Sequence, residues 1–238
     1  MRFIIHEQPY ERPVSSGMWR YYHGNQPTGA VEKWRLTDAV DGFYFMRVDL
    51  DARAAASGRS YLYHLTADNH GHPVQLKFRL WDGDKEIIGL VLLEKDTVIV
   101  TREINGHRLE DVLPVENGYA FWYPASTGLG LLSARQMETV LTGVSLRTET
   151  GTIETEMSPF VTKLELIDGE NQDMQLMDQS RTMKKRTIRW NEQQRTLWLD
   201  ENRWPLKMER SDGLVAVESK YILFQRISRP SFPASNED

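Results

Sequence analysis

Apolar and polar residues alternate along much of this chain, which is the pattern of a β-strand with one buried face. The alternation is clearest in residues 44–50 and 74–80, where every second side chain is apolar. Similar runs predict further strands at residues 31–36, 61–66, 97–104, 141–148, 160–167, 186–190, 196–200 and 214–224. The chain is therefore predicted to be rich in β-structure.

Turn-forming pairs separate these runs. Asn-Gly and Asp-Gly tolerate the positive φ angles that tight hairpins require. The pairs are Asp41-Gly42, Ser57-Gly58, Asp82-Gly83, Asn105-Gly106, Asn117-Gly118, Asp168-Gly169 and Asp212-Gly213. Short strands joined by such turns indicate an antiparallel meander.

Helical patterns are scarce. The best candidate is the segment from Ser126 to Val140, although Gly128 and Gly130 are poor helix formers. Strands do not alternate with long amphipathic helices, so a doubly wound α/β fold is not expected.

Two segments repeat the same turn pattern. Residues 65–76 and 197–208 each end a strand in Asp and place a proline five residues later, and both pairs are offset by 132 residues. In each segment an Asx turn would reverse the chain and the proline would open the next strand. Two explanations stay open: coincidence between hairpins with common turn chemistry, or two similar meanders packed into one curved sheet.

The segment Leu197-Trp-Leu-Asp-Glu-Asn-Arg-Trp-Pro-Leu-Lys-Met208 resembles hairpins of the lipoprotein-carrier-like proteins, a group that includes putative glycolipid-binding families of bacteria. The resemblance implies a strongly curved antiparallel sheet, an open half-barrel closed on one side by helices. It covers about a dozen residues and the strand rhythm, and no functional residue carries over by motif. We therefore expect an all-β or mostly β fold, a single curved antiparallel sheet (open or half barrel) of about ten strands with little helix. The expected organisation is an N-terminal arm at 1–14, one domain at 15–228 and a disordered tail at 229–238.

Composition narrows the possible functions. The 238 residues contain no cysteine, which excludes disulfides, thiolate metal sites and cysteine nucleophiles. Lys and Arg number 29 against 34 Asp and Glu, so the net charge of -5 argues against nucleic acid as a partner. The first nine residues do not form a signal peptide and the longest apolar run, 87–93, is too short to span a membrane. We expect a soluble cytoplasmic protein, and its oligomeric state stays open.

No motif in the sequence predicts catalysis. His64, His70 and His72 form the only histidine cluster with ligand-like spacing, but His70 and His72 fall in a predicted turn. Nucleophile elbows and phosphate loops are absent. The sequence therefore predicts neither a metal site, nor a cofactor, nor a catalytic residue.

Aromatic residues point instead to a binding site. In the segment 118–124, Tyr119, Phe121 and Tyr123 share one face of an extended chain and Trp122 lies on the other. Core packing explains such a cluster, and so does the wall of a ligand pocket, which is apolar with a few placed polar groups. Of this cluster we expect Trp122 in the core and Tyr123 at the pocket. The predicted ligand-binding residues are Arg47, Tyr119, Phe121, Tyr123 and Glu94.

Three functions follow from these expectations. The first is non-catalytic binding of a hydrophobic or amphipathic small molecule, a lipid or glycolipid, in the half-barrel. The second is an enzyme that uses the same cavity as a reaction chamber, with Arg47, Glu94 and Glu103 near it. The third is an interaction scaffold that pairs through a sheet edge.

Overall fold

In a computed structural model, which describes residues 7–39, 41–83, 85–135, 139–148, 152, 155–176 and 179–224, the chain forms one sheet of fifteen strands. One short helix, α1 (Ser126–Ala134), accompanies the sheet. The strands are β1 (Glu11–His23), β2 (Gln26–Ala39), β3 (Tyr44–Asp51), β4 (Ser60–Ala67), β5 (Pro73–Asp82), β6 (Lys85–Leu93), β7 (Thr97–Ile104), β8 (His107–Pro114), β9 (Ala120–Phe121), β10 (Val140–Leu146), β11 (Pro159–Leu176), β12 (Gln179–Trp190), β13 (Gln193–Leu199), β14 (Pro205–Arg210) and β15 (Leu214–Leu223).

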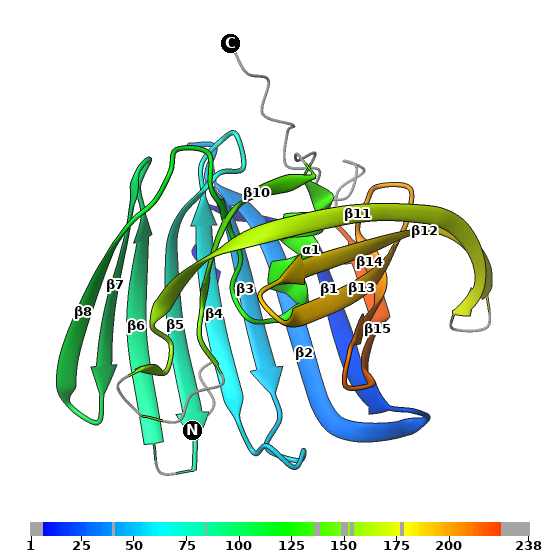
Figure 1. The fold of residues 1–238 in the computed structure, drawn as a ribbon, viewed down its shortest axis with the longest axis horizontal. Coiled ribbons are helices and arrows are strands. Elements are labelled where there is room, and N and C mark those ends of the chain that lie inside the picture. Colours follow the sequence, from blue (N-terminus) through cyan, green and yellow to red (C-terminus); the bar gives the residue numbers. More distant parts are fainter. Residues whose placement is uncertain are drawn as a thin grey trace.

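The sheet consists of two meanders that meet at its centre (Figure 1). Strands β1 to β8 follow one another to one edge, and β15 back to β9 follow one another to the other edge. The first and last strands join the halves, because β1 pairs antiparallel with β15 from Ser15–Leu223 to His23–Leu214. All strand pairs are antiparallel except the short parallel pair of β9 and β10. The expected single curved antiparallel sheet is confirmed.

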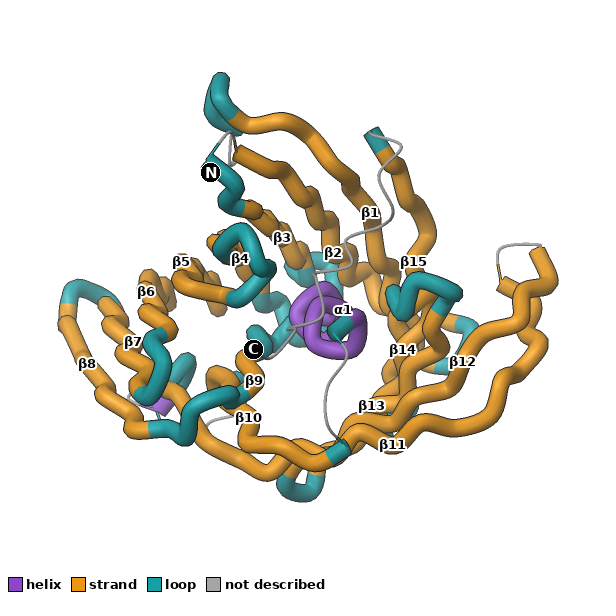
Figure 2. The backbone as a smooth tube through the Cα atoms, turned by 90° about the horizontal axis from the view of Figure 1, so that it is seen from above, coloured by secondary structure: helices purple, strands orange, loops and turns teal. Residues whose placement is uncertain are grey.

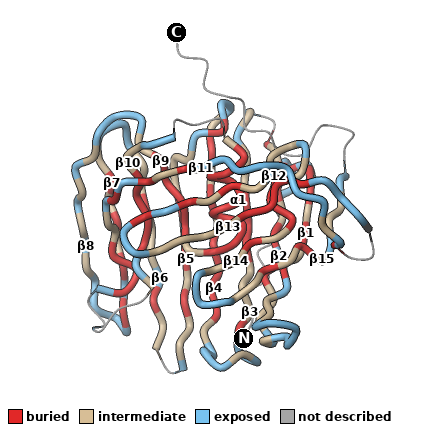
Figure 3. The backbone as a smooth tube through the Cα atoms, turned by 45° about the vertical axis from the view of Figure 1, so that its right-hand side comes forward, coloured by how far each residue is buried: buried red, intermediate tan, exposed pale blue. Residues whose placement is uncertain are grey.

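The sheet curves around helix α1, which lies in its hollow (Figure 2). All nine helix residues are buried, as in a core helix, and none of them carries a charge. The strands that surround it carry buried side chains along most of their length, whereas β8 and the outer part of β11 are exposed (Figure 3). The core is therefore the concave face of the sheet together with α1.

The two helix glycines allow this close packing. A Cβ atom on Gly128 would collide with the carbonyl oxygen of Tyr123, and one on Gly130 would lie 3.2 Å from the Trp204 ring. These residues lower helix propensity, but they let the helix approach the chain around it. The predicted helix is present, and it ends at Ala134 rather than Val140.

The prediction of about ten strands is wrong, because the sheet has fifteen. The uncounted strands are β1, β6, β8, β9 and β14. Strand β1 begins at Glu11, so part of the predicted N-terminal arm belongs to the sheet. The predicted tail at 229–238 lies outside the described residues.

Six of the seven predicted turn glycines have a positive φ angle between 61° and 88°. Asp168-Gly169 is the exception, since this pair lies inside β11, where the register with β12 shifts between Asp168 and Asn171. Here the turn signal marks a β-bulge instead of a reversal of the chain.

The two repeated segments form equivalent turns. Asp68 Oδ1 accepts hydrogen bonds from the backbone N–H groups of His70 (2.9 Å) and His72 (2.8 Å). Asp200 Oδ1 accepts the corresponding bonds from Asn202 and Trp204, both at 2.9 Å. A register shift precedes each turn at the same place.

Both turns contact the helix or its end. Arg135, which follows α1, donates to the carbonyl of Gly71 in the first turn, and Trp204 in the second turn packs against Gly130. The repeat therefore corresponds to two hairpins that bracket α1 from the two halves of the sheet.

Candidate functional site

A cavity of about 540 Å³ opens on the concave side of the sheet, at the N-terminal end of α1. One wall comes from the first meander, including Leu50 and Tyr61, and the other from the second meander, including Leu146 and Met208. Both halves of the sheet and the helix thus contribute to it. Its volume is within the range of small-molecule binding sites.

Polarity changes from the floor of the cavity to its rim. Buried apolar side chains form the floor, among them Trp122, Leu129, Leu146, Met208 and Ala216. Exposed polar residues from strand ends and turns form the rim: His23, Arg147, Asn191 and Asp212. The cavity is therefore amphipathic, with an apolar interior and a polar mouth.

An aromatic cluster forms part of the wall. The Trp122 ring makes edge contacts with Phe160 (6.0 Å between centroids) and Trp190 (5.4 Å), and all three residues line the cavity. The Arg147 guanidinium lies 5.3 Å from the Phe160 ring centre, and that of Arg195 lies 5.0 Å from the Trp190 ring centre. These cation–π contacts place two positive charges beside aromatic wall residues.

A buried carboxylate caps the helix next to the cavity. Glu32 on β2 is fully buried and accepts hydrogen bonds from the backbone N–H groups of Ser126 (3.0 Å) and Thr127 (2.7 Å). The hydroxyls of Tyr21 and Thr127 donate to the same carboxylate. Because the helix N-cap, Ala125, makes no side-chain cap, Glu32 supplies from another strand the acceptor that the first turn needs.

This network holds the cavity floor and leaves one acceptor toward it. Burial raises the pKa of Glu32 against the effect of its hydrogen bonds, and burial and the Glu32 charge raise the pKa of Tyr21 well above its usual value. Tyr21 therefore stays protonated and donates, while its oxygen lies 2.8 Å from Ser126 Oγ. Because the Tyr21 hydroxyl donates its hydrogen bond to Glu32, Ser126 donates to the Tyr21 oxygen, and the lone pairs of the Ser126 hydroxyl can accept from a ligand hydroxyl.

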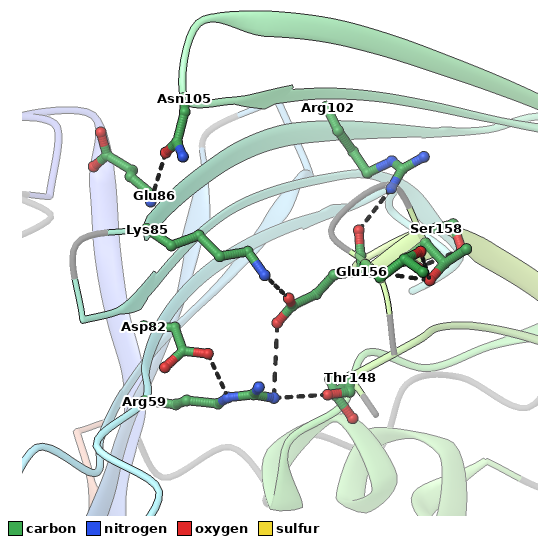
Figure 4. A network of polar contacts seen from close by, with 11 residues as sticks. Arg59, Asp82, Lys85, Glu86, Arg102, Asn105, Thr148, Glu156 and Ser158 are labelled. Atoms are coloured by element: carbon green, nitrogen blue, oxygen red, sulfur yellow. Dashed lines mark hydrogen bonds and ion pairs between the residues drawn. The ribbon is translucent and has the colours of Figure 1, made fainter. Parts of the chain in front are cut away.

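A second polar network ties the segment between β10 and β11 to the first meander (Figure 4). Arg59 bonds Asp82 at 2.9 Å and donates to the carbonyl of Thr148 at 2.8 Å, and Lys85 pairs with the buried carboxylate of Glu156. Arg102 donates to the Glu156 carbonyl at 2.6 Å. Since Thr148 lines the cavity, this network fixes one side of its mouth.

Arg47, the predicted polar anchor, lies away from the cavity. Its neighbours Met46 and Val48 belong to the concave core, so Arg47 points to the convex face. There it is buried and forms two hydrogen bonds with the carboxylate of Glu11 (2.5 and 2.6 Å) and one with Thr37 (3.0 Å). Its role in this structure is a buried ion pair between β1 and β3.

Glu94 and Tyr119 lie together, but outside the cavity wall. Glu94 is exposed in the turn between β6 and β7, and its carbonyl accepts a 2.9 Å hydrogen bond from the Tyr119 hydroxyl. Burial and the Glu94 charge raise the pKa of Tyr119 to about 12. This contact fastens the segment before β9 to the β6–β7 turn.

Phe121 and Tyr123 belong to the core. Tyr123 is 1% exposed and its ring packs 4.9 Å from that of Tyr63. Trp122 is buried in the core, as expected, and it also lines the cavity, whereas Tyr123, expected at the pocket, does not line it. The reason is local: the chain bends after Tyr123 into the helix, so the inner face of this segment is covered by α1.

Sequence reasoning missed most of the wall, including Phe160, Trp190 and both flanking arginines. Trp190 and Arg195 flank the turn between β12 and β13. The only sequence feature that could have pointed to them as cavity-lining residues is an aromatic residue and an arginine at neighbouring strand ends. The three residues proposed for an enzyme do not converge, because Arg47 is on the convex face and Glu94 and Glu103 are exposed.

Within the described part of the chain, no group of three or more His, Asp or Glu side chains is arranged to hold a metal ion. His70 and His72 are exposed in the Asx turn described above. The same residues include no helix with the length and apolar character needed to cross a membrane.

Fold and site together define one large, curved and open β-sheet with a helix in its hollow and an amphipathic cavity at the helix N-terminus. Comparisons with family models, curated proteins and solved structures find no match for this chain.

Proposed function

We propose that this protein binds an amphipathic small molecule, a lipid or glycolipid, in the cavity at the N-terminal end of α1. The observation that carries the proposal is the change from a buried apolar floor to an exposed polar rim within one cavity of about 540 Å³. An amphiphile has the same change of polarity along its length. Its tail would cover the apolar floor and its headgroup would meet the rim.

The hydrogen bonds around the floor favour binding over catalysis. The Ser126 hydroxyl lines the cavity beside the Glu32 network, but the Ser126 backbone N–H already donates to Glu32. Tyr21, whose oxygen lies 2.8 Å from the Ser126 hydroxyl, stays protonated because its pKa is raised, so it cannot accept the serine proton. A serine nucleophile needs a base that accepts its proton and free N–H groups for the oxyanion. This site supplies neither of them at Ser126.

The scaffold alternative has little support at the β8 edge of the sheet. Strand β8 carries His107, Arg108, Glu110 and Asp111 and ends at Pro114. Charged residues and proline on an edge strand oppose pairing with another chain.

Titration with a neutral amphiphile, dodecyl maltoside below its micelle concentration, tests the proposal. We expect saturable binding at one site by isothermal calorimetry, with a change in tryptophan fluorescence because Trp122 and Trp190 line the cavity. The variant Ala55→Phe, which adds a ring at the cavity wall, should lose at least about 90% of this affinity. Ala54→Phe is the matched control, because Ala54 is exposed and does not line the cavity. This variant should bind the amphiphile with wild-type affinity.

Two results would overturn the proposal. One is the absence of saturable binding of any uncharged, anionic or cationic dodecyl amphiphile. The other is equal binding by Ala55→Phe and Ala54→Phe, which would place the ligand elsewhere.

A further inference from the structure

We infer that two copies of this protein associate through the convex face of strands β5 to β8, which form one end of the sheet (Figure 1). The partner is a second copy of the chain, packed face to face and related by a twofold axis. This inference goes beyond the proposed function, since the cavity opens on the opposite, concave side of the sheet.

The apolar character of β6 on both faces is the first observation. Ile87 and Val91 point to the concave core, where both are fully buried. Ile88, Leu90 and Leu92 alternate with them and therefore point to the convex face. Strands that are apolar on both faces are usually covered on both. Among the described residues nothing buries this second face, because Ile88 is 44% exposed and Leu90 and Leu92 are only half-buried.

The two neighbouring strands extend this apolar surface. The registers place Ile99 of β7 beside Leu92, and Val112 of β8 beside Ile99. Val112 is 60% exposed, more than any other large apolar side chain in the described part of the chain. We call Ile88, Leu90, Leu92, Ile99 and Val112 the convex patch. A contiguous apolar patch with a polar border is typical of a surface that contacts another protein.

Opposite charges border the convex patch on its two sides. One row of paired residues across the sheet consists of Lys77 on β5, Leu90, Thr101 and Glu110 on β8. Lys77 and Glu110 are both exposed. The row thus has a positive end, an uncharged centre and a negative end. A surface with this order of charges is complementary to a second copy of itself.

A twofold axis parallel to the strands, between β6 and β7, uses this complementarity. It places β5 of one copy over β8 of the other, so Lys77 of each copy faces Glu110 of the other. In the adjacent row Leu92 of each copy faces Ile99 of the other, at the centre of the contact. A twofold axis across the strands would instead bring the two copies of Lys77 together. Charge therefore selects the first orientation.

The next row brings two arginines near each other across the contact, Arg79 of one copy and Arg108 of the other. Each of them has a carboxylate on its own chain, since Arg79 pairs with Glu86 and Arg108 lies 3.7 Å from Glu110. The contact therefore does not bring unpaired like charges together.

The size of the contact indicates reversible association. Three rows of side chains on four strands, at about 3.3 Å per residue and about 4.8 Å between strands, give a footprint of about 400 Å² on each copy. Stable interfaces bury roughly 800 Å² per partner. We therefore expect an equilibrium between monomer and dimer rather than a permanent dimer.

Sedimentation velocity of the full chain over a concentration series tests the inference. Wild-type protein should change from monomer to dimer between about 1 and about 500 μM. Lys77→Glu and Glu110→Lys should each weaken dimerisation about tenfold or more, because both ion pairs between the copies become like-charge contacts. Lys33→Glu is the matched control, since Lys33 is an exposed lysine on β2, outside the patch. This variant should dimerise as wild type does.

An equimolar mixture of Lys77→Glu and Glu110→Lys gives the sharpest result. In a mixed dimer the acidic side chain introduced at position 77 faces the basic one introduced at position 110, and the native Lys77 and Glu110 face each other. Both contacts are then attractive, so the mixture should regain wild-type dimerisation although neither variant dimerises well alone. This recovery would also show that both variants are folded.

Three results would overturn the inference. The first is a monomer at every concentration. The second is dimerisation that both charge variants leave unchanged, because the contact would then lie on another face. The third is a mixture of the two variants that associates no better than either variant alone.

Discussion

His64 lies in a row of basic side chains on the convex face. The strand registers place Arg35, Arg47, His64 and Lys77 side by side across β2, β3, β4 and β5. Burial and the charges of Arg47 and Lys77 lower the pKa of His64 from 6.5 to about 4. The imidazole is therefore neutral in the folded protein at pH values where it would be protonated in the unfolded chain.

This difference predicts a loss of stability in mild acid. Because the folded pKa lies below the unfolded one, the contribution of His64 is complete above pH 6.5 and is lost as the pH falls from 6.5 toward about 4. Between pH 7 and pH 4.5, the free energy of unfolding measured in urea should fall less for His64→Gln than for wild type. The difference between the two losses should be roughly 1–3 kcal/mol.

His107→Gln is the control, because His107 is an exposed histidine on the edge strand β8. Comparison with wild type at each pH removes the contributions of the carboxylates, which all three proteins share. Equal acid sensitivity of wild type and His64→Gln would contradict the assignment.

Glu32 provides the corresponding prediction at the scale of the helix. Its two carboxylate oxygens accept from Ser126, Thr127 and Tyr21, and an amide can replace only one of these oxygens as an acceptor. Glu32→Gln should therefore leave a helix N–H or the Tyr21 hydroxyl without its acceptor.

The expected loss in the free energy of unfolding is about 1–3 kcal/mol, measured by urea denaturation at pH 7. Glu103→Gln is the control, because Glu103 is an exposed strand carboxylate and should change little. A Glu32→Gln variant as stable as the control would show that the helix does not depend on this cap.

Four of the five strands that were not counted from the sequence have identifiable physical reasons. β8 lies at the edge and has no buried residue, β9 has only two residues, and β1 contains Pro13 and Gly17. β6 is a nearly continuous apolar run, from which the period of two cannot be read. Strands with one buried face, such as β3 and β5, followed the alternation and were predicted within a few residues.

The helix shows the opposite case, in which tertiary packing reverses a local preference. Gly128 and Gly130 argue against a helix in isolation, yet the space beside Tyr123 and Trp204 admits no larger residue without adjustment. The repeated Asx turns, by contrast, could be predicted from the sequence. Each is determined by hydrogen bonds between an Asp side chain and backbone N–H groups only a few residues away.

At the scale of the whole molecule, the cavity exists only because the two meanders meet. Its wall combines β2, β3 and β4 from one half with β11, β12 and β14 from the other. No local pattern could show that Trp122, Phe160 and Trp190 come together. The predicted residues Arg47, Glu94, Tyr119, Phe121 and Tyr123 were chosen from single segments, and that choice could not distinguish the convex face or the core from a cavity wall.

Photo-crosslinking with a dodecyl maltoside that carries a diazirine in its tail tests the central claim, which is the location of the ligand. After irradiation and proteolysis, mass spectrometry should find the label on cavity-lining segments from both halves, including the peptides that contain Trp122, Leu146 and Met208. Excess dodecyl maltoside without the diazirine should prevent this labelling by competition, and the labelling should be absent in the variant Ala55→Phe. Labelling confined to the convex face around Arg47 or to the edge strand β8, or labelling unchanged in Ala55→Phe, would contradict the assignment of this cavity as the binding site.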